Sequence, residues 1–142
     1  MSGKAFLDTN ILVYTFDDQD PGKREVARTM VKSALRDRTA IISFQVIQEF
    51  LNVATRKFAT PLTETDSALY LEKVLNPLCE VHSSIDLYRD ALNIQDRWKY
   101  GFYDSLILAA SLAGNCDTLF TEDLQHGQKI RDITIINPFL DP

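Results

Sequence analysis

Short apolar runs alternate with stretches of helical periodicity along almost the whole chain, and this alternation limits the fold more than any other feature. The runs have the length of buried strands, and the last one stops just before Pro138. They lie at residues 5–7, 40–42, 79–82, 118–121 and 133–136. Strands that alternate with helices predict an α/β fold: a three-layer sandwich with a mainly parallel central sheet flanked by helices.

The stretches between the runs carry helix signals at their ends. Asp20 and Pro21 form an N-cap followed by proline at the first helical position, Ser43 and Ser84 can cap the helices that follow them, and Gly114 can end one. We expect helices at residues 11–14, 21–36, 44–58, within 61–77, and at 85–98 and 102–113. The last of these is apolar nearly all round, so it is expected to be buried.

Length and composition bound the class of protein. A chain of 142 residues with 45% hydrophobic and 25% charged residues is typical of one soluble domain, so residues 1–142 are expected to form a single domain. No apolar run approaches the roughly 18 residues of a membrane span, and the first residues do not resemble a signal peptide. Cys79 and Cys116 lie in apolar surroundings and are expected to stay reduced. These features predict a cytoplasmic protein with no membrane partner.

The net charge of −5 and the pI near 4.9 bear on possible partners. Taken alone they argue against nucleic-acid binding, because that function usually needs a basic face. The objection weakens if several of the acids form one metal site, since bound cations invert the local electric field.

Four acids occur at similar places in the predicted fold. Asp8 follows the first strand, Glu49 lies in the helix after the second, Asp104 opens the buried helix, and Asp123 follows a late strand. Each also has a purely structural interpretation. Asp8 and Asp104 can cap or start helices, Glu49 can sit in solvent at the margin of an apolar face, and Asp123 can belong to a turn.

Together the four acids can converge at one edge of the sheet, because the carboxyl ends of parallel strands open into a shared crevice. Two carboxylates about 5 Å apart repel by roughly 3 kcal/mol at an effective dielectric constant near 20, so a cluster of four needs divalent cations to stay ionised. Hard oxygen ligands favour Mg²⁺ or Mn²⁺. His82, His126 and the two cysteines have no zinc-binding spacing.

Four segments of the chain, in order, carry a family resemblance. They are residues 6–14 (FLDTNILVY), 43–50 (SFQVIQEF), 103–110 (YDSLILAA) and 119–124 (LFTEDL). In these segments the chain resembles PIN-domain nucleases, in particular the small VapC-like toxins of toxin–antitoxin pairs. The resemblance spans nearly the whole chain, and it implies a PIN-like fold.

The resemblance also implies roles for individual residues. Asp8, Asp104 and Asp123 would be direct or water-mediated metal ligands, with Glu49 as the fourth acid of the site. The polar side chains that would orient the carboxylates or waters are Asn10, Ser43, Ser105 and Thr121. The family's Thr-x-Asp spacing selects Asp123 and leaves the neighbouring Glu122 pointing elsewhere.

The reaction that the resemblance implies is hydrolysis of an RNA phosphodiester bond by water, with Mg²⁺ or Mn²⁺ as the cofactor. It also implies two protein partners. One is a cognate antitoxin that blocks the acidic site with a basic side chain, and the other is a second copy of the chain in a homodimer.

The segment before Asp104 mixes basic and aromatic residues and is a candidate for holding RNA. We expect Arg97 or Lys99 to contact phosphate and Tyr100 or Trp98 to stack on a base. The alternative is that Trp98 belongs to the core, with Phe102, and that the cations are merely solvated.

Three rival functions stay open at this stage. A haloacid-dehalogenase-like phosphatase would use the acid after the first strand as a nucleophile, but it needs Asp-x-Asp where this chain has Asp8-Thr9-Asn10. A phosphoacceptor receiver domain needs an acidic pair directly after that strand and a lysine after a late one, and neither is present at those places. The third rival is a PIN domain that only binds RNA or protein.

Overall fold

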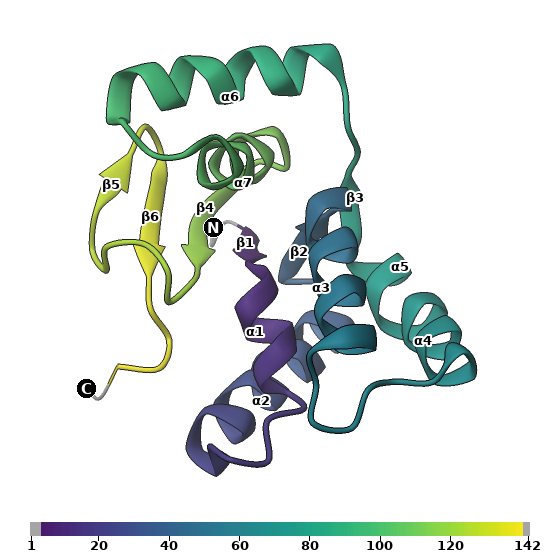
Figure 1. Cartoon of the computed structure of the whole chain (residues 1–142). Coiled ribbons are helices and arrows are strands. Elements are labelled where there is room, and N and C mark those ends of the chain that lie inside the picture. Colours follow the sequence, from purple (N-terminus) through teal and green to yellow (C-terminus); the bar gives the residue numbers. More distant parts are fainter. Residues whose placement is uncertain (1–3, 141–142) are drawn as a thin grey trace.

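The computed structural model describes residues 4–140 and contains a sheet with the strand order β3-β2-β1-β4-β6-β5 (Figure 1). The strands are β1 (Lys4–Leu7), β2 (Ala40–Ser43), β3 (Cys79–Val81), β4 (Cys116–Phe120), β5 (Lys129–Ile130) and β6 (Ile133–Ile136). All neighbouring strands run parallel except β5, which is antiparallel to β6. The mainly parallel sheet confirms the predicted fold class.

Strand β5 is the one strand that the sequence did not predict. It has two residues and pairs with β6 through a tight hairpin in which Arg131 has a φ of 50°. Two residues are too few to show the alternation of apolar and polar side chains by which a strand is recognised.

The helices are α1 (Thr9–Tyr14), α2 (Pro21–Asp37), α3 (Phe44–Arg56), α4 (Glu64–Tyr70), η1 (Leu71–Leu75), α5 (Asn76–Leu78), α6 (Ile85–Trp98) and α7 (Phe102–Ala113). The helix predicted within residues 61–77 begins at Glu64, because the Thr63 hydroxyl caps it by accepting a 3.1 Å hydrogen bond from Asp66 N. A π-helical turn, η1, interrupts it just before Pro77. Proline has no N–H and its ring crowds the preceding turn, which the wider π turn accommodates.

Helices cover the sheet as the alternating pattern predicts. Helix α7 packs on β4 and β6, and α6 packs in turn on α7, at the top of Figure 1. Helices α2 and α5 contact β2, and α1 leaves the end of β1 and packs against α2 and α3. Asp8 is the N-cap of α1 directly after β1, and Asp123 lies in the loop between β4 and β5.

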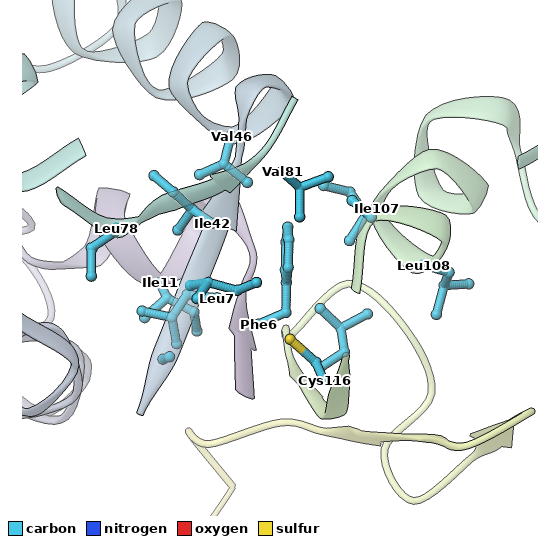
Figure 2. Packing of buried hydrophobic residues seen from close by; sticks show 14 of the residues in the cluster. Phe6, Leu7, Ile11, Ile42, Val46, Leu78, Val81, Ile107, Leu108 and Cys116 are labelled. Carbon is cyan, nitrogen blue, oxygen red and sulfur yellow. The ribbon is translucent and has the colours of Figure 1, made fainter. Parts of the chain in front are cut away.

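The core lies on both faces of the central strands. Phe6 and Leu7 are fully buried neighbours on β1 whose side chains point to opposite faces of the sheet. Figure 2 shows Phe6 among Val81, Ile107 and Cys116, and Leu7 on the side of Ile11. Helix α7 is buried from Ser105 through Ser111, as its apolar composition predicts.

Gly114 ends α7 for a reason other than backbone freedom. Its φ is −82°, and the left-handed residue of this turn is Asn115, with a φ of 60°. A Cβ atom at Gly114 would lie 2.3 Å from Ile41 Cδ1. Any larger residue at this position would require the Ile41 side chain on β2 to move.

The structure describes both cysteines and the length and apolar character of each helix. Cys79 and Cys116 are both free thiols, and burial raises the pKa of each. No helix in residues 4–140 combines the length and the apolar character that crossing a bilayer requires.

Candidate metal centre

The candidate site lies where β1 and β4 end side by side. The backbone N–H of Asp8 continues the ladder between these strands by donating a 3.0 Å hydrogen bond to Phe120 O. From β1 the chain crosses to β2 on one side of the sheet, whereas β4 lies on the other side. This is the switch point of the sheet, where the loops after the strands diverge and leave room for a ligand.

Asp8 is both a helix cap and part of this edge. Its side chain is buried, with 7% of its surface exposed. Oδ1 accepts a 2.7 Å hydrogen bond from Thr9 N at the start of α1, and Oδ2 accepts a 2.8 Å bond from Thr121 Oγ1. Capping and a place in the acidic site are therefore compatible for this residue.

The Thr121 hydroxyl connects several of the predicted residues. It donates to Asp8, and it accepts hydrogen bonds from Asp123 N at 3.1 Å and from Asn10 Nδ2 at 3.2 Å. Asn10 Nδ2 also donates to Asp123 Oδ2 at 3.0 Å. With one donor and two acceptor positions in use, the hydroxyl has no further capacity, so its orientation is fixed.

Glu49 is held by two residues that sequence reasoning missed. Its Oε1 accepts a 2.6 Å hydrogen bond from Thr9 Oγ1, and its Oε2 accepts a 3.3 Å bond from Gln45 Nε2. Gln45 Nε2 also donates to Tyr103 O at 3.2 Å, which ties α3 to the residue before Asp104. A signal for Gln45 was present in the sequence, because it precedes Glu49 by one helical turn.

Asp123 and Glu49 each act electrostatically on both Asp8 and Asp104. Burial, with smaller contributions from Asp123 and Glu49, raises the pKa of the Asp8 carboxyl to about 7. Burial also raises the pKa of Asp104, and again Asp123 and Glu49 add to the effect. Burial is the largest cause in both cases, and the two neighbouring carboxylates add to it.

Ser43, at the end of β2, and Ser105, directly after Asp104 on α7, differ from Asn10 and Thr121. Both are fully buried, and within residues 4–140 neither hydroxyl has a hydrogen-bond partner. Ser43 occupies the N-cap position of α3 as expected, yet its side chain makes no capping hydrogen bond. Neither hydroxyl is therefore seen to orient a carboxylate directly.

Glu122 and Asp123 point to different partners. The Glu122 carboxylate accepts hydrogen bonds from Tyr14 OH and, at 2.8 Å, from Lys23 Nζ. Asp123 instead faces Asn10 on the side of Asp8. Glu122 thus points away from Asp123, which is the arrangement that the Thr-x-Asp spacing implied.

The basic and aromatic segment before Asp104 forms the turn between α6 and α7. Arg97 and Lys99 are exposed, and the Arg97 guanidinium lies 5.1 Å from the centre of the Trp98 ring. Tyr100 OH donates to Gln128, and the nearby Asp104 contributes to raising the Tyr100 pKa, after burial. Trp98 is partly buried against the core, as the structural interpretation had it.

The donor set of this edge fits a hard, hydrated cation. Within the described residues, no three His, Cys, Asp or Glu side chains stand in an arrangement that would hold a metal ion. Mg²⁺, however, usually keeps several waters and binds through one or two carboxylates with substrate phosphates completing its shell. The buried Asn10 Oδ1, which has no hydrogen-bond partner among the described residues, adds another oxygen ligand of the kind Mg²⁺ accepts.

Fold and site together define an α/β protein with clustered acids at the carboxyl edge of a parallel sheet. The model of the PIN domain family matches residues 5–130. The chain therefore belongs to the PIN domain family, as the four sequence segments indicated. A comparison with curated proteins gives no significant match.

Solved structures with the same fold include proteins of toxin–antitoxin systems. A toxin–antitoxin complex from Klebsiella pneumoniae has a TM-score of 0.68 at 18% identity, over 95% of this chain and 98% of that one. VapBC2 of Rickettsia felis, bound to a promoter DNA fragment, gives 0.65 at 18%, over 92% and 96%. VapC20 of Mycobacterium tuberculosis, described as a toxin that cleaves the sarcin–ricin loop, gives 0.62 at 17%, over 82% and 87%.

Proposed function

We propose that this protein is an endoribonuclease that depends on Mg²⁺ or Mn²⁺, with Asp8, Glu49, Asp104 and Asp123 as its catalytic acids. The observation that carries the proposal is the burial of the Asp8 carboxylate, which Thr121 and Asn10 link to Asp123 through hydrogen bonds. This burial, with smaller contributions from Asp123 and Glu49, raises the pKa of Asp8 to about 7. A buried acid surrounded by like charges is destabilising in the absence of a counterion. A bound divalent cation offsets that cost, so the arrangement of the acids favours a metal-binding role.

In this proposal Asp8, Asp104 and Asp123 hold the cation, directly or through water, and Glu49 completes the donor set. When bound, the cation lowers the pKa of water and offsets charge on the phosphate and the leaving oxygen. Thr121 and Asn10 keep Asp8 and Asp123 oriented through the hydrogen bonds described above. Thr9 and Gln45 do the same for Glu49, since they donate to its two oxygens.

Ser43 and Ser105 are proposed to act through water. Their hydroxyls are buried and are not used by other hydrogen bonds within residues 4–140. Such hydroxyls can orient a water beside the carboxylates, a role that fits their places at the end of β2 and directly after Asp104.

RNA is proposed to be held beside Asp104 by the turn between α6 and α7. Arg97 and Lys99 are exposed there and can reach phosphates, and Tyr100 offers an aromatic side chain next to the acid. Because the chain has a net charge of −5, cations close to the site matter more than the overall charge. The cation at the acids would reduce the remaining repulsion of the RNA backbone.

The biological role that we propose is that of the toxin in a type II toxin–antitoxin pair. Support comes from the fold neighbours, which include toxin–antitoxin complexes and a toxin that cleaves RNA at the sarcin–ricin loop. The corresponding partners are a cognate antitoxin, whose basic side chain would enter the acidic site, and a second copy of the chain in a homodimer. The site of action would be the cytoplasm.

The rival functions are less well supported. Membership of the PIN family disfavours a haloacid-dehalogenase-like phosphatase and a receiver domain, since each belongs to a different family. Trapping of a phosphoryl group on Asp8 would restore the first. A PIN domain that only binds RNA is the remaining rival, and the presence of all four acids disfavours it.

The test is incubation of the purified protein with mixed RNAs in the presence of Mg²⁺ or Mn²⁺, with and without a chelator, beside the Asp8→Asn variant. We expect cleavage that requires the cation and is lost in the variant. Cleavage that survives both the chelator and Asp8→Asn would rule out the metal mechanism. Binding of RNA without any cleavage would favour the non-catalytic rival.

A further inference from the structure

Glu122 takes part in a cluster outside the four acids. Its carboxylate accepts from Tyr14 OH and from Lys23 Nζ, and Lys23 Nζ also donates to Tyr14 OH at 3.2 Å. The three side chains come from the loop after β4, from α1 and from α2. The Glu122 carboxylate, the Lys23 ammonium and the Tyr14 hydroxyl therefore each contact the other two.

Aromatic rings enclose the cation of this cluster. Lys23 Nζ lies 4.7 Å from the centre of the Tyr14 ring and 5.5 Å from that of Phe139, and these two rings meet edge to face at 4.9 Å. The contact with Glu122, the largest influence, raises the pKa of Lys23, so the ammonium stays charged at any physiological pH. A cation between two ring faces and a carboxylate is well defined in position.

The loop that Glu122 anchors also carries Asp123. Asp123 is exposed, and within residues 4–140 its carboxylate has a single hydrogen-bond partner, Asn10 Nδ2. Asn10 and Tyr14 are one turn apart on α1, so this short helix contacts the two consecutive acids, Asn10 at Asp123 and Tyr14 at Glu122. The position of Asp123 therefore depends on how firmly its neighbour is held.

The charge of Lys23 also favours a role in positioning Asp123. Without Lys23, Glu122 would add a fifth negative charge directly beside Asp123 and would be repelled by the acids. With Lys23 at 2.8 Å that charge is compensated, and the carboxylate is turned toward α2. The ion pair is partly exposed, with 32% and 22% of the two side-chain surfaces accessible, so its contribution to folding is small.

We propose that Glu122, Lys23 and Tyr14 form a positioning cluster that holds Asp123 at the metal site, and that its main effect is on metal affinity. The inference rests on the proposed function. None of the three side chains contacts one of the four catalytic acids through a described hydrogen bond, so they act through the Thr121–Asp123 loop. They are positioning residues and not catalytic ones.

The test compares Mn²⁺ binding, measured by calorimetry, with RNA cleavage for Glu122→Gln, Lys23→Met and Tyr14→Phe. These changes keep the size and the apolar stem of each side chain and remove only the charge or the hydroxyl. We expect Mn²⁺ affinity to fall about 10-fold and kcat to fall with it at subsaturating metal, while KM for RNA stays within about 2-fold. Excess Mn²⁺ should restore most of the cleavage.

The matched control is Asp90→Asn, which removes another partly exposed ion pair, the one between Asp90 and Arg131 at 2.9 Å. It should change thermal stability by an amount similar to Lys23→Met and leave Mn²⁺ affinity unchanged. If the three cluster variants behave like Asp90→Asn, the cluster is only structural and the inference is overturned. If the wild-type protein binds no Mn²⁺ at all, the proposed function fails first and the inference falls with it.

Discussion

Thr121 Oγ1 donates a 2.8 Å hydrogen bond to Asp8 Oδ2, and this bond joins the acid after β1 to the loop after β4. The two residues are 113 positions apart in the sequence. The same hydroxyl accepts from Asp123 N, so it sets the distance between two of the four acids. The geometry of the candidate site therefore depends on a side chain that carries no charge.

The substitution Thr121→Val keeps the shape of the side chain and removes the hydroxyl. Asp8 then loses a donor, Asp123 N loses its acceptor, and Asn10 Nδ2 keeps only its hydrogen bond to Asp123. We expect a stability loss of about 1–3 kcal/mol and a fall in metal-dependent cleavage of about 10- to 100-fold. Chemical denaturation and a cleavage assay measure the two effects. Thr121→Ser should recover most of both, and a Thr121→Val protein as active as the wild type would contradict the role.

Asp8 should make the metal-free protein less stable as pH rises. Its pKa is about 7 in the folded protein against 3.8 for the ordinary group, so the folded state binds the proton more tightly than the unfolded state does. The stability from this proton is present below about pH 4 and is lost as pH rises through about 7. At 1.36 kcal/mol per unit the loss amounts to about 4 kcal/mol.

The variant Asp8→Asn isolates this effect. Asparagine has one acceptor oxygen where Asp8 accepts from both Thr9 N and Thr121 Oγ1, so one of these hydrogen bonds is lost, which costs about 1 kcal/mol. At pH 8 without metal the variant should nevertheless unfold at higher denaturant than the wild type, and at pH 4 it should not. Added Mg²⁺ should stabilise the wild type only. Equal stability differences at both pH values would contradict the raised pKa.

Thr9 should matter through Glu49. Thr9→Val removes the 2.6 Å bond to Glu49 Oε1 and leaves only the longer bond from Gln45. We expect cleavage to fall about 10-fold while the fold is retained. Thr55→Val is the control, because its hydroxyl donates to Leu51 O at an exposed position of α3, the helix that carries Glu49. Similar activities for the two variants would remove Thr9 from the site.

Arg97 and Lys99 should contribute to RNA affinity through charge. Substituting either with alanine should weaken RNA binding. It should also make the negative slope of log K against log salt shallower, by about one for each phosphate that is no longer neutralised. Arg36→Ala serves as the control. Arg36 is also exposed, but it lies near the end of α2, which precedes the amino end of β2 and not the carboxyl end of a strand. Identical salt slopes for all three variants would mean that the α6–α7 turn does not hold RNA.

The sequence predicted those parts of the molecule that depend on local patterns. Apolar runs mark β1 and β4 because burial requires them. Asp8 follows β1 directly, and Asp123 lies in the loop just after β4. The placement of the acids at one edge then follows from the parallel sheet. The two-residue strand β5 and the π turn before Pro77 left no such pattern, since their geometry depends on neighbours in the fold.

The supporting side chains could not be predicted for a different reason. Thr9 and Gln45 are ordinary helix residues until Glu49 is placed beside them. The contact of Glu122 with Lys23 spans 99 positions, and it depends on how α2 packs beside the loop after β4. Polar pairs across the sheet have no period in the sequence, so only the assembled fold reveals them.

The most direct test of the central claim is calorimetric titration of Mn²⁺ into the wild-type protein and into the Asp8→Asn, Asp104→Asn and Asp123→Asn variants. If the acids form one metal site, the wild type binds Mn²⁺ saturably and each of the three substitutions weakens that binding by at least about 10-fold. Unchanged binding in all three variants, or no binding to the wild type, would contradict the account.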